Sequence, residues 1–216
     1  DDQLVVEEKG IYSIEKFLIA RRLMYWQVYL HKTVLSSENM LINILKRAKQ
    51  LISNGENIYA TSSLNKFLSK KFSLSDFKND KLILETFAKL DDHDIYACLK
   101  EWRSEKDFVL SNLSSRILDR KPLKIKIQNI PFSEGEIKSE RNKVMKKLSI
   151  SENESKFFVF SNKVSNNTYQ IGKAKINILM KSGKVMDITE ASDQFNIDAL
   201  SKTVNKYFLC YPKFVY

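Results

Sequence analysis

The chain has 216 residues, 43% of them hydrophobic, with only 5 glycines and 3 prolines, which excludes a disordered or collagen-like chain and allows a packed core. No apolar run approaches the roughly 18 residues that a membrane-spanning helix needs. The net charge of +10 favours anionic partners such as nucleotides, nucleic acid or acidic proteins.

The first 120 residues are predicted to be helical. Apolar side chains recur at helical spacing from Ser13 to about Ile52, and Ser53-Asn54-Gly55 is a suitable end for this long helix. A bend is expected near Ser36-Ser37. Four shorter helices are predicted to follow, over residues 62–72, 75–89, about 92–102 and about 105–118.

After residue 120 the pattern changes to a smaller α+β module. Apolar and polar residues alternate from Leu123 to Gln128, which predicts a half-buried strand, and Ser133 with Glu136 forms a possible capping box for a helix. The later elements are a strand over 157–164, a hairpin of 175–180 and 184–189, a helix over about 196–205 and a strand over 207–211. The predicted class is α+β: a helical region (1–120) with one long helix, then a module (121–216) with a mainly antiparallel sheet.

One face of the long helix combines cations with phenols. At 100° per residue, Arg21, Lys32, Tyr25 and Tyr29 fall within 80° of one another, and Arg22 lies at 100° from Arg21. Guanidinium and ammonium groups suit phosphate oxygens, and a tyrosine packs on a sugar or base while donating a hydrogen bond. The face therefore fits one wall of a nucleotide pocket. The alternative is an amphipathic helix whose cations extend to solvent beside core tyrosines.

Two motifs resemble HD-domain phosphohydrolases, in the branch of the deoxynucleoside triphosphate triphosphohydrolases. Gly10 to Phe17, followed by the segment that contains Arg21, Tyr29 and His31-Lys32, is similar to the long helix after the HD core. Tyr25 stands where some relatives have a histidine. The segment LDDHDIYACLKEW (90–102), with Leu118-Asp119-Arg120 and a basic strand after it, is the second match, and the resemblance covers roughly residues 4–130.

The resemblance implies an intact enzyme that hydrolyses nucleotides, with a divalent metal ion as its cofactor. In this family a histidine, a His-Asp pair and a later aspartate hold the metal, and all precede the long helix. We therefore expect this chain to be the C-terminal part of such an enzyme, with no catalytic and no metal-binding residue of its own. Arg21, Tyr25, Tyr29 and Lys32 are the expected substrate-binding residues. A homo-oligomer is expected, and a nucleotide effector is a possible further partner.

Histidine and cysteine are scarce. The dipeptide His93-Asp94 is literally an HD pair, but only His31 could join it in a metal site. Asp91-Asp92-His93-Asp94 stands at a predicted helix start, where acidic residues favour the positive end of the helix dipole, so we interpret it as a cap. Cys98 and Cys210 show no CxxC pattern, which favours a cytoplasmic location without disulfides.

Two other functions stay open at this stage. Residues 116–147 contain ten lysines and arginines against four acidic residues. This cluster and the aromatic residues Phe157, Phe158 and Phe160 suit a non-catalytic module that binds nucleic acid or a nucleotide. The other alternative is a structural dimerisation fragment, in which the long amphipathic helix binds no ligand.

Overall fold

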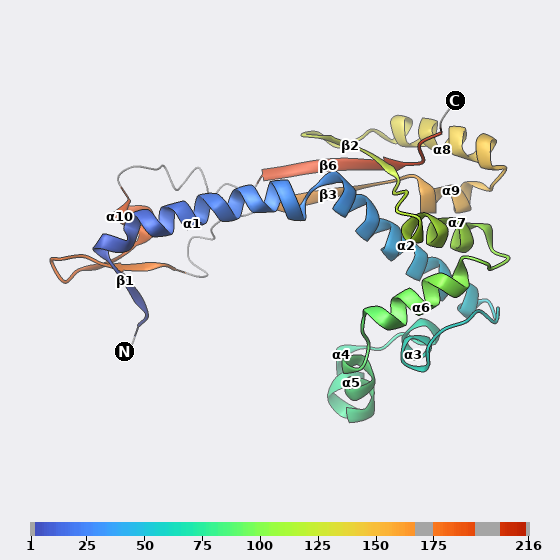
Figure 1. The fold of residues 1–216 in the computed structure, drawn as a ribbon, viewed down its shortest axis with the longest axis horizontal. Coiled ribbons are helices and arrows are strands. Elements are labelled where there is room, and N and C mark those ends of the chain that lie inside the picture. Colours follow the sequence, from blue (N-terminus) through green and yellow to red (C-terminus); the bar gives the residue numbers. More distant parts are fainter. Residues whose placement is uncertain (1–2, 167–174, 193–203, 215–216) are drawn as a thin grey trace. The chain divides into compact units, whose positions relative to one another are not determined.

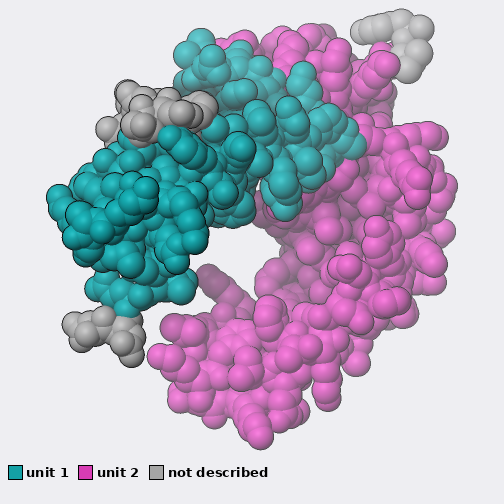
Figure 2. All heavy atoms as spheres, turned by 60° about the vertical axis from the view of Figure 1, so that its left-hand side comes forward, with its two compact units in different colours: residues 1–34, 127–132, 161–208 teal, residues 35–126, 133–160, 209–216 magenta. Residues whose placement is uncertain are grey.

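The computed structural model describes residues 3–166, 175–192 and 204–214 (Figure 1). The chain divides into two compact units, coloured separately in Figure 2, and neither unit is continuous in sequence. Unit 1 comprises residues 1–34, 127–132 and 161–208, and unit 2 comprises 35–126, 133–160 and 209–216. The sequence predicts instead two continuous parts, residues 1–120 and 121–216, and this division stays a prediction. In the described ranges no helix combines the length and apolarity needed to cross a membrane.

Unit 1 is built on a helix and a small sheet. The helical elements before residue 30 are η1 (Glu8–Gly10), α1 (Ile11–Met24) and the π-helix η2 (Tyr25–Tyr29). The sheet has the order β1-β4-β5, with β1 parallel to β4 and β4 antiparallel to β5. Its strands, and the short helix that follows them, are β1 (Val5–Glu7), β4 (Asn177–Leu179), β5 (Val185–Asp187) and α10 (Ile188–Ala191).

The core of unit 1 joins segments that lie far apart in the sequence. Ile11 and Leu18 of α1 are seven residues apart, so they lie on one face of the helix. They pack with Ile178 of β4 and Ile188 of α10, which are fully buried. Burial of one face of α1 against the sheet leaves its other face available for a site.

Unit 2 is mainly helical. Its first helix, α2 (Lys32–Ser53), buries Met40, Ile44 and Ala48 at intervals of four residues, as an amphipathic helix does. The helices that follow before residue 120 are α3 (Ser62–Ser69), α4 (Leu74–Asn79), α5 (Lys81–Ala88), α6 (Asp92–Trp102) and α7 (Phe108–Leu118). The last two helices of the unit are α8 (Glu134–Leu148) and α9 (Glu152–Phe158).

Two polar side chains of α2 form hydrogen bonds with partners distant in sequence. The buried Ser36 hydroxyl donates to the Leu123 carbonyl at 2.8 Å, and the amide of Asn43 donates to the Phe157 carbonyl at 3.0 Å. These bonds connect α2 to the strand and helix of the second half of the chain. Because an unpaired polar group in a core is costly, such bonds also fix which segments α2 can pack against.

A second sheet has the strand order β2-β6-β3. Its strands are β2 (Lys124–Gln128), β3 (Phe160–Asn166) and β6 (Val204–Tyr211). Leu123 and Ile125 are buried whereas Lys124 and Lys126 are exposed, so the alternation read from the sequence is confirmed for β2. The predicted α+β class, with a helical first part and small, mainly antiparallel sheets, is likewise confirmed.

Several element boundaries differ from the prediction. The long helix is not continuous from Ser13 to Ile52: it is interrupted at Leu30 and His31, and α2 runs without a break through the expected bend at Ser36-Ser37. The helix predicted over 75–89 is two helices, because Asp80 caps the start of α5. Residues 204 and 205 belong to β6, and the rest of the helix predicted over about 196–205 lies outside the described residues.

Candidate functional site

The candidate site lies on the exposed face of α1 and η2. The opposite face of α1 is fixed by the core of unit 1, to which Glu15 also belongs although it carries a carboxylate. Glu15 is almost completely buried and accepts a short hydrogen bond from the Ser192 hydroxyl. The orientation of the helix about its axis is therefore set by apolar contacts and by one buried polar contact.

The helix widens at the C-terminal end of the site. Residues 25–29 form a π-helix, and the backbone N–H of Leu30 donates to the carbonyl of Tyr25 at 2.7 Å, five residues earlier. Such turns are rare and occur often at functional sites. The ammonium of Lys206 in β6 lies 4.4 Å from the centroid of the Trp26 ring, a cation–π contact between β6 and the π-helix.

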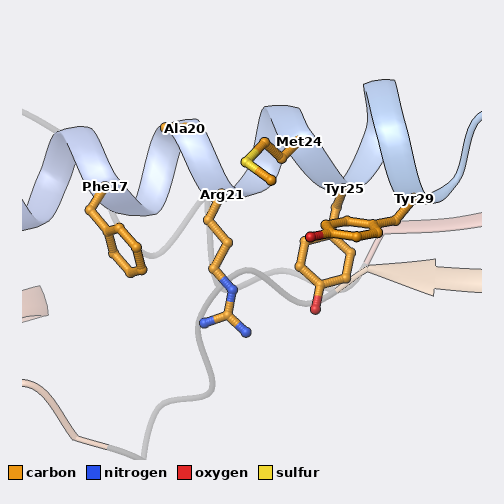
Figure 3. Close-up of a pocket in the computed structure, with 6 residues that line it drawn as sticks. All are labelled: Phe17, Ala20, Arg21, Met24, Tyr25 and Tyr29. Carbon is orange, nitrogen blue, oxygen red and sulfur yellow. The ribbon is translucent and has the colours of Figure 1, made fainter.

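A pocket of about 450 Å³ opens along this face (Figure 3). Its lining combines one cation, two phenols and three apolar side chains: Phe17, Ala20, Arg21, Met24, Tyr25 and Tyr29. The guanidinium carbon of Arg21 lies 5.8 Å from the centre of the Tyr25 ring, and the rings of Tyr25 and Tyr29 are 5.2 Å apart at 55°. Figure 3 shows the guanidinium and both phenol oxygens on the same side of the helix.

This arrangement suits an anion attached to a ring or sugar. In the described part of the chain no carboxylate forms an ion pair with Arg21, so its five N–H donors remain available to phosphate oxygens. The two tyrosine rings provide an apolar surface with a polar edge, as a ribose or base requires. The site therefore has the means to bind a nucleotide, while its residues offer no group placed to activate water.

Three of the four predicted binding residues meet in this pocket. Arg21, Tyr25 and Tyr29 line it, whereas Lys32 does not and is instead the exposed first residue of α2. The prediction assumed 100° per residue throughout, and the π-turn followed by the break at Leu30 and His31 removes Lys32 from that register. His31 Nδ1 accepts the backbone N–H of Thr33 at 3.3 Å, at the start of α2.

The apolar lining was missed in the sequence although the signal was present. On the same helical wheel Phe17 and Met24 fall at 40° and 60° on the other side of Arg21, so they border the cationic face. Both are about half exposed in the structure, Phe17 at 57% and Met24 at 48%. Because the walls of a nucleotide pocket are mostly apolar, these two side chains extend the polar face into a pocket lining.

The His93-Asp94 dipeptide is a helix cap, as predicted. The Asp91 carboxylate accepts hydrogen bonds from the backbone N–H groups of His93 and Asp94, and the Asp94 carboxylate accepts one from the backbone N–H of Asp91. These hydrogen bonds lower the pKa of Asp91. The His93 side chain is 96% exposed. Within the described ranges no three histidine, cysteine or acidic side chains come together as metal ligands would, so these residues do not fit a catalytic metal ion.

Comparison with known proteins places the chain in a class. Residues 1–65 match the family described as the HD associated region. The chain is similar to the crystal structure of a phosphohydrolase from Bacteroides thetaiotaomicron VPI-5482, with a TM-score of 0.91 and 45% sequence identity. The match covers 99% of this chain and 53% of that protein. Residues 1–65 thus form an HD-associated region, and the chain as a whole is similar to about half of a phosphohydrolase, which agrees with the resemblance to HD-domain phosphohydrolases read from the sequence.

Two further proteins are similar over part of their length. The uncharacterized protein YwfO of Bacillus subtilis (strain 168) is 36% identical over 120 residues, which are 56% of this chain and 26% of that protein. A hypothetical protein from Aquifex aeolicus is similar in fold, with a TM-score of 0.55 at 21% identity, over 97% of this chain and 44% of that one. The matched parts of the chain therefore span between a quarter and about half of the length of these three proteins.

Proposed function

We propose that this chain is the C-terminal part of a metal-dependent HD phosphohydrolase that hydrolyses nucleotides, in the manner of a deoxynucleoside triphosphate triphosphohydrolase. The observation that carries the proposal is the meeting of Arg21, Tyr25 and Tyr29 in one pocket beside a π-helix, inside the HD-associated region. Catalysis requires a metal and an activated water, and both belong to the metal-binding core of the intact enzyme.

In this proposal each pocket residue has a role. Arg21 binds the phosphate chain, because its planar guanidinium can donate two parallel hydrogen bonds to phosphate oxygens. Tyr25 and Tyr29 contact the sugar or base, and the apolar side chains of Phe17 and Met24 exclude water from the ligand. All of these groups bind and orient the substrate, so the chain alone has no hydrolytic activity.

The exposed apolar side chains of the same helix support contact with the rest of the enzyme. Leu23 and Val28 are about half exposed and do not line the pocket. Apolar groups of this size gain free energy when they are buried, at about 25 cal/mol per Å². We assign this surface to the metal-binding core, and assign the helices and sheets beyond it to an interface between copies of the enzyme. The buried, unpaired Cys98 and Cys210 suit a cytoplasmic location.

The test uses the complete product of the gene. It should release triphosphate from deoxynucleoside triphosphates in the presence of a divalent metal. An Arg21→Ala variant should lose about 10- to 100-fold in kcat/KM, because a hydrogen bond to a charged group contributes about 1.5 to 3 kcal/mol. Arg21→Lys should lose less, since it keeps the charge but not the paired hydrogen bonds.

A matched control comes from the same helix. Lys16→Ala removes an exposed cation of α1 that does not line the pocket, and it should keep nearly the parental kcat/KM. If Arg21→Ala and Lys16→Ala behave alike, the pocket assignment is wrong. If the complete protein hydrolyses no nucleotide at all, the proposed activity itself is wrong, whatever the pocket binds. Sedimentation of the complete protein tests the proposed interface between copies.

A further inference from the structure

The exposed face of β2 and the end of β6 carry an unusual combination of charge and aromatic surface. Lys124 and Lys126 are two residues apart on β2, so both point to the exposed face of the sheet, roughly 6.6 Å from each other along the strand. Tyr211 is the last residue of the neighbouring strand β6. The ammonium groups of Lys124 and Lys126 lie 5.9 and 5.6 Å from the centroid of its ring.

These two cations lack a carboxylate partner in the described ranges of the chain, where neither forms an ion pair within 4 Å. The carboxylate with which Lys126 interacts at longer range is Glu136. Glu136 is already engaged, because it accepts the backbone N–H of Ser133 at 2.9 Å and its hydroxyl at 2.8 Å, and these bonds are the main reason why its pKa is lowered. Two ammonium groups therefore converge on one ring without an ion pair within 4 Å, and the negative charge of Glu136 lies farther away.

The same unit carries a second pair of this kind. The ammonium of Lys147, near the end of α8, lies 5.9 Å from the centroid of Phe214, three residues beyond Tyr211. Lys213 between the two rings is exposed, and both rings are half-buried. Lysines and partly exposed aromatic rings therefore lie near one another on β2, at the end of β6 and in the residues that follow it, all within unit 2. We call Lys124, Lys126, Tyr211 and Phe214 the lysine–aromatic surface.

The chemistry of this surface selects its ligand. The phosphates of a nucleic acid strand would bind the lysine ammonium groups and draw them away from the aromatic rings. A planar base could then stack on the uncovered ring. In a duplex the bases are already stacked and their faces are closed to the rings. A polyphosphate or an anionic lipid surface would leave the rings without a role. A single strand offers phosphates and free base faces together.

We propose that the lysine–aromatic surface binds single-stranded nucleic acid, independently of the proposed nucleotide pocket. The assay is the fluorescence anisotropy of a labelled 20-nucleotide oligothymidylate, titrated with the protein at several salt concentrations. Unlabelled duplex, inorganic polyphosphate and anionic phospholipid vesicles serve as competitors. The single strand should bind, and its affinity should fall linearly with the logarithm of the salt concentration. The three competitors should displace it poorly.

Two variants separate charge from stacking. A double variant, Lys124→Gln with Lys126→Gln, should reduce the salt slope by about 1.4 and the affinity at 0.1 M salt by about 25-fold, since each neutralised phosphate contributes about 0.7 to the slope. Tyr211→Leu should weaken binding by about 5- to 100-fold without changing the slope, because base stacking depends little on salt. Circular dichroism and thermal melting establish that the variants are folded.

The control removes the same charge elsewhere in unit 2. Lys71→Gln with Lys78→Gln lies on exposed positions around α4 and should leave both the affinity and the slope nearly unchanged. Equal losses in the two double variants would show a nonspecific effect of net charge and overturn the proposal. So would equally tight binding of the duplex or of polyphosphate, or an unaltered affinity in a folded Tyr211→Leu variant.

Discussion

Removal of one partner of the ion pair between Arg47 and Asp107 should destabilise unit 2. The two side chains are only 19% and 12% exposed, and the guanidinium donates two hydrogen bonds to the carboxylate, at 2.6 and 3.1 Å. Asp107 also caps α7 by accepting the backbone N–H of Leu110 at 2.8 Å. Asp107→Asn keeps a capping side chain but removes the charge, so it separates the loss of the ion pair from the loss of the cap.

The expected cost of Asp107→Asn is about 3 kcal/mol, because it leaves the Arg47 guanidinium partly buried without its partner. For a chain of this size that corresponds to a decrease in Tm of roughly 6 to 12 °C. Urea unfolding and calorimetry at pH 7 measure both quantities. The control is Asp119→Asn, which breaks the more exposed pair with Arg103, 48% and 31% exposed, and should cost at most about 1 kcal/mol.

The same pair predicts a dependence on pH. Burial alone would raise the pKa of Asp107, but the hydrogen bonds and charge of Arg47 bring it below its ordinary value. The stabilisation is therefore complete above the ordinary aspartate pKa of about 3.9, and it is lost as the pH falls through the lower pKa of the folded state. The difference between the parent and Asp107→Asn should shrink below about pH 4. Equal costs of the Asp107 and Asp119 substitutions at pH 7 would refute this reasoning.

Three further predictions concern unit 2. Trp102→Phe should cost about 1 to 3 kcal/mol by urea unfolding, because the fully buried indole N–H donates to the Tyr59 carbonyl at 2.7 Å, which would be left without a partner. Ser133→Ala should cost about 1 kcal/mol in the same assay, since it breaks the capping box of α8, and Ser133→Asn should restore most of it. Burial raises the pKa of the Cys210 thiol to about 12. Alkylation of Cys210 by iodoacetamide at pH 8, followed by mass spectrometry, should therefore be roughly a thousandfold slower in the folded protein than in the protein unfolded in urea. A native rate like that of the unfolded chain would contradict the burial.

The elements with local signals were predictable from the sequence. Helix caps are short-range, so Asp91 and Ser133 were identified at their correct helix starts. The same signal is present at Ser151, whose capping box with Glu154 begins α9, so residues 157 and 158 end a helix where the sequence pattern predicts a strand.

Other features depend on contacts that no local pattern reveals. Strand β1 has three residues, too few for periodicity, and it exists because Val6 pairs with Ile178, which lies far along the chain. The π-turn at residues 25–29 follows from no glycine or proline, and it changes which side chains share a face. The sequence predicts Arg21, Tyr25, Tyr29 and Lys32 on one face; the first three line the pocket, whereas Lys32 lies beyond the π-turn and does not line it.

The most direct test of the proposed function is a crystal structure of the complete protein with a nonhydrolysable deoxynucleoside triphosphate analogue. The proposal predicts phosphate oxygens within about 3 Å of the Arg21 guanidinium nitrogens, a hydrogen-bonding distance, with the sugar or base against Tyr25 and Tyr29. An analogue bound elsewhere, with the pocket on α1 and η2 vacant, would contradict it.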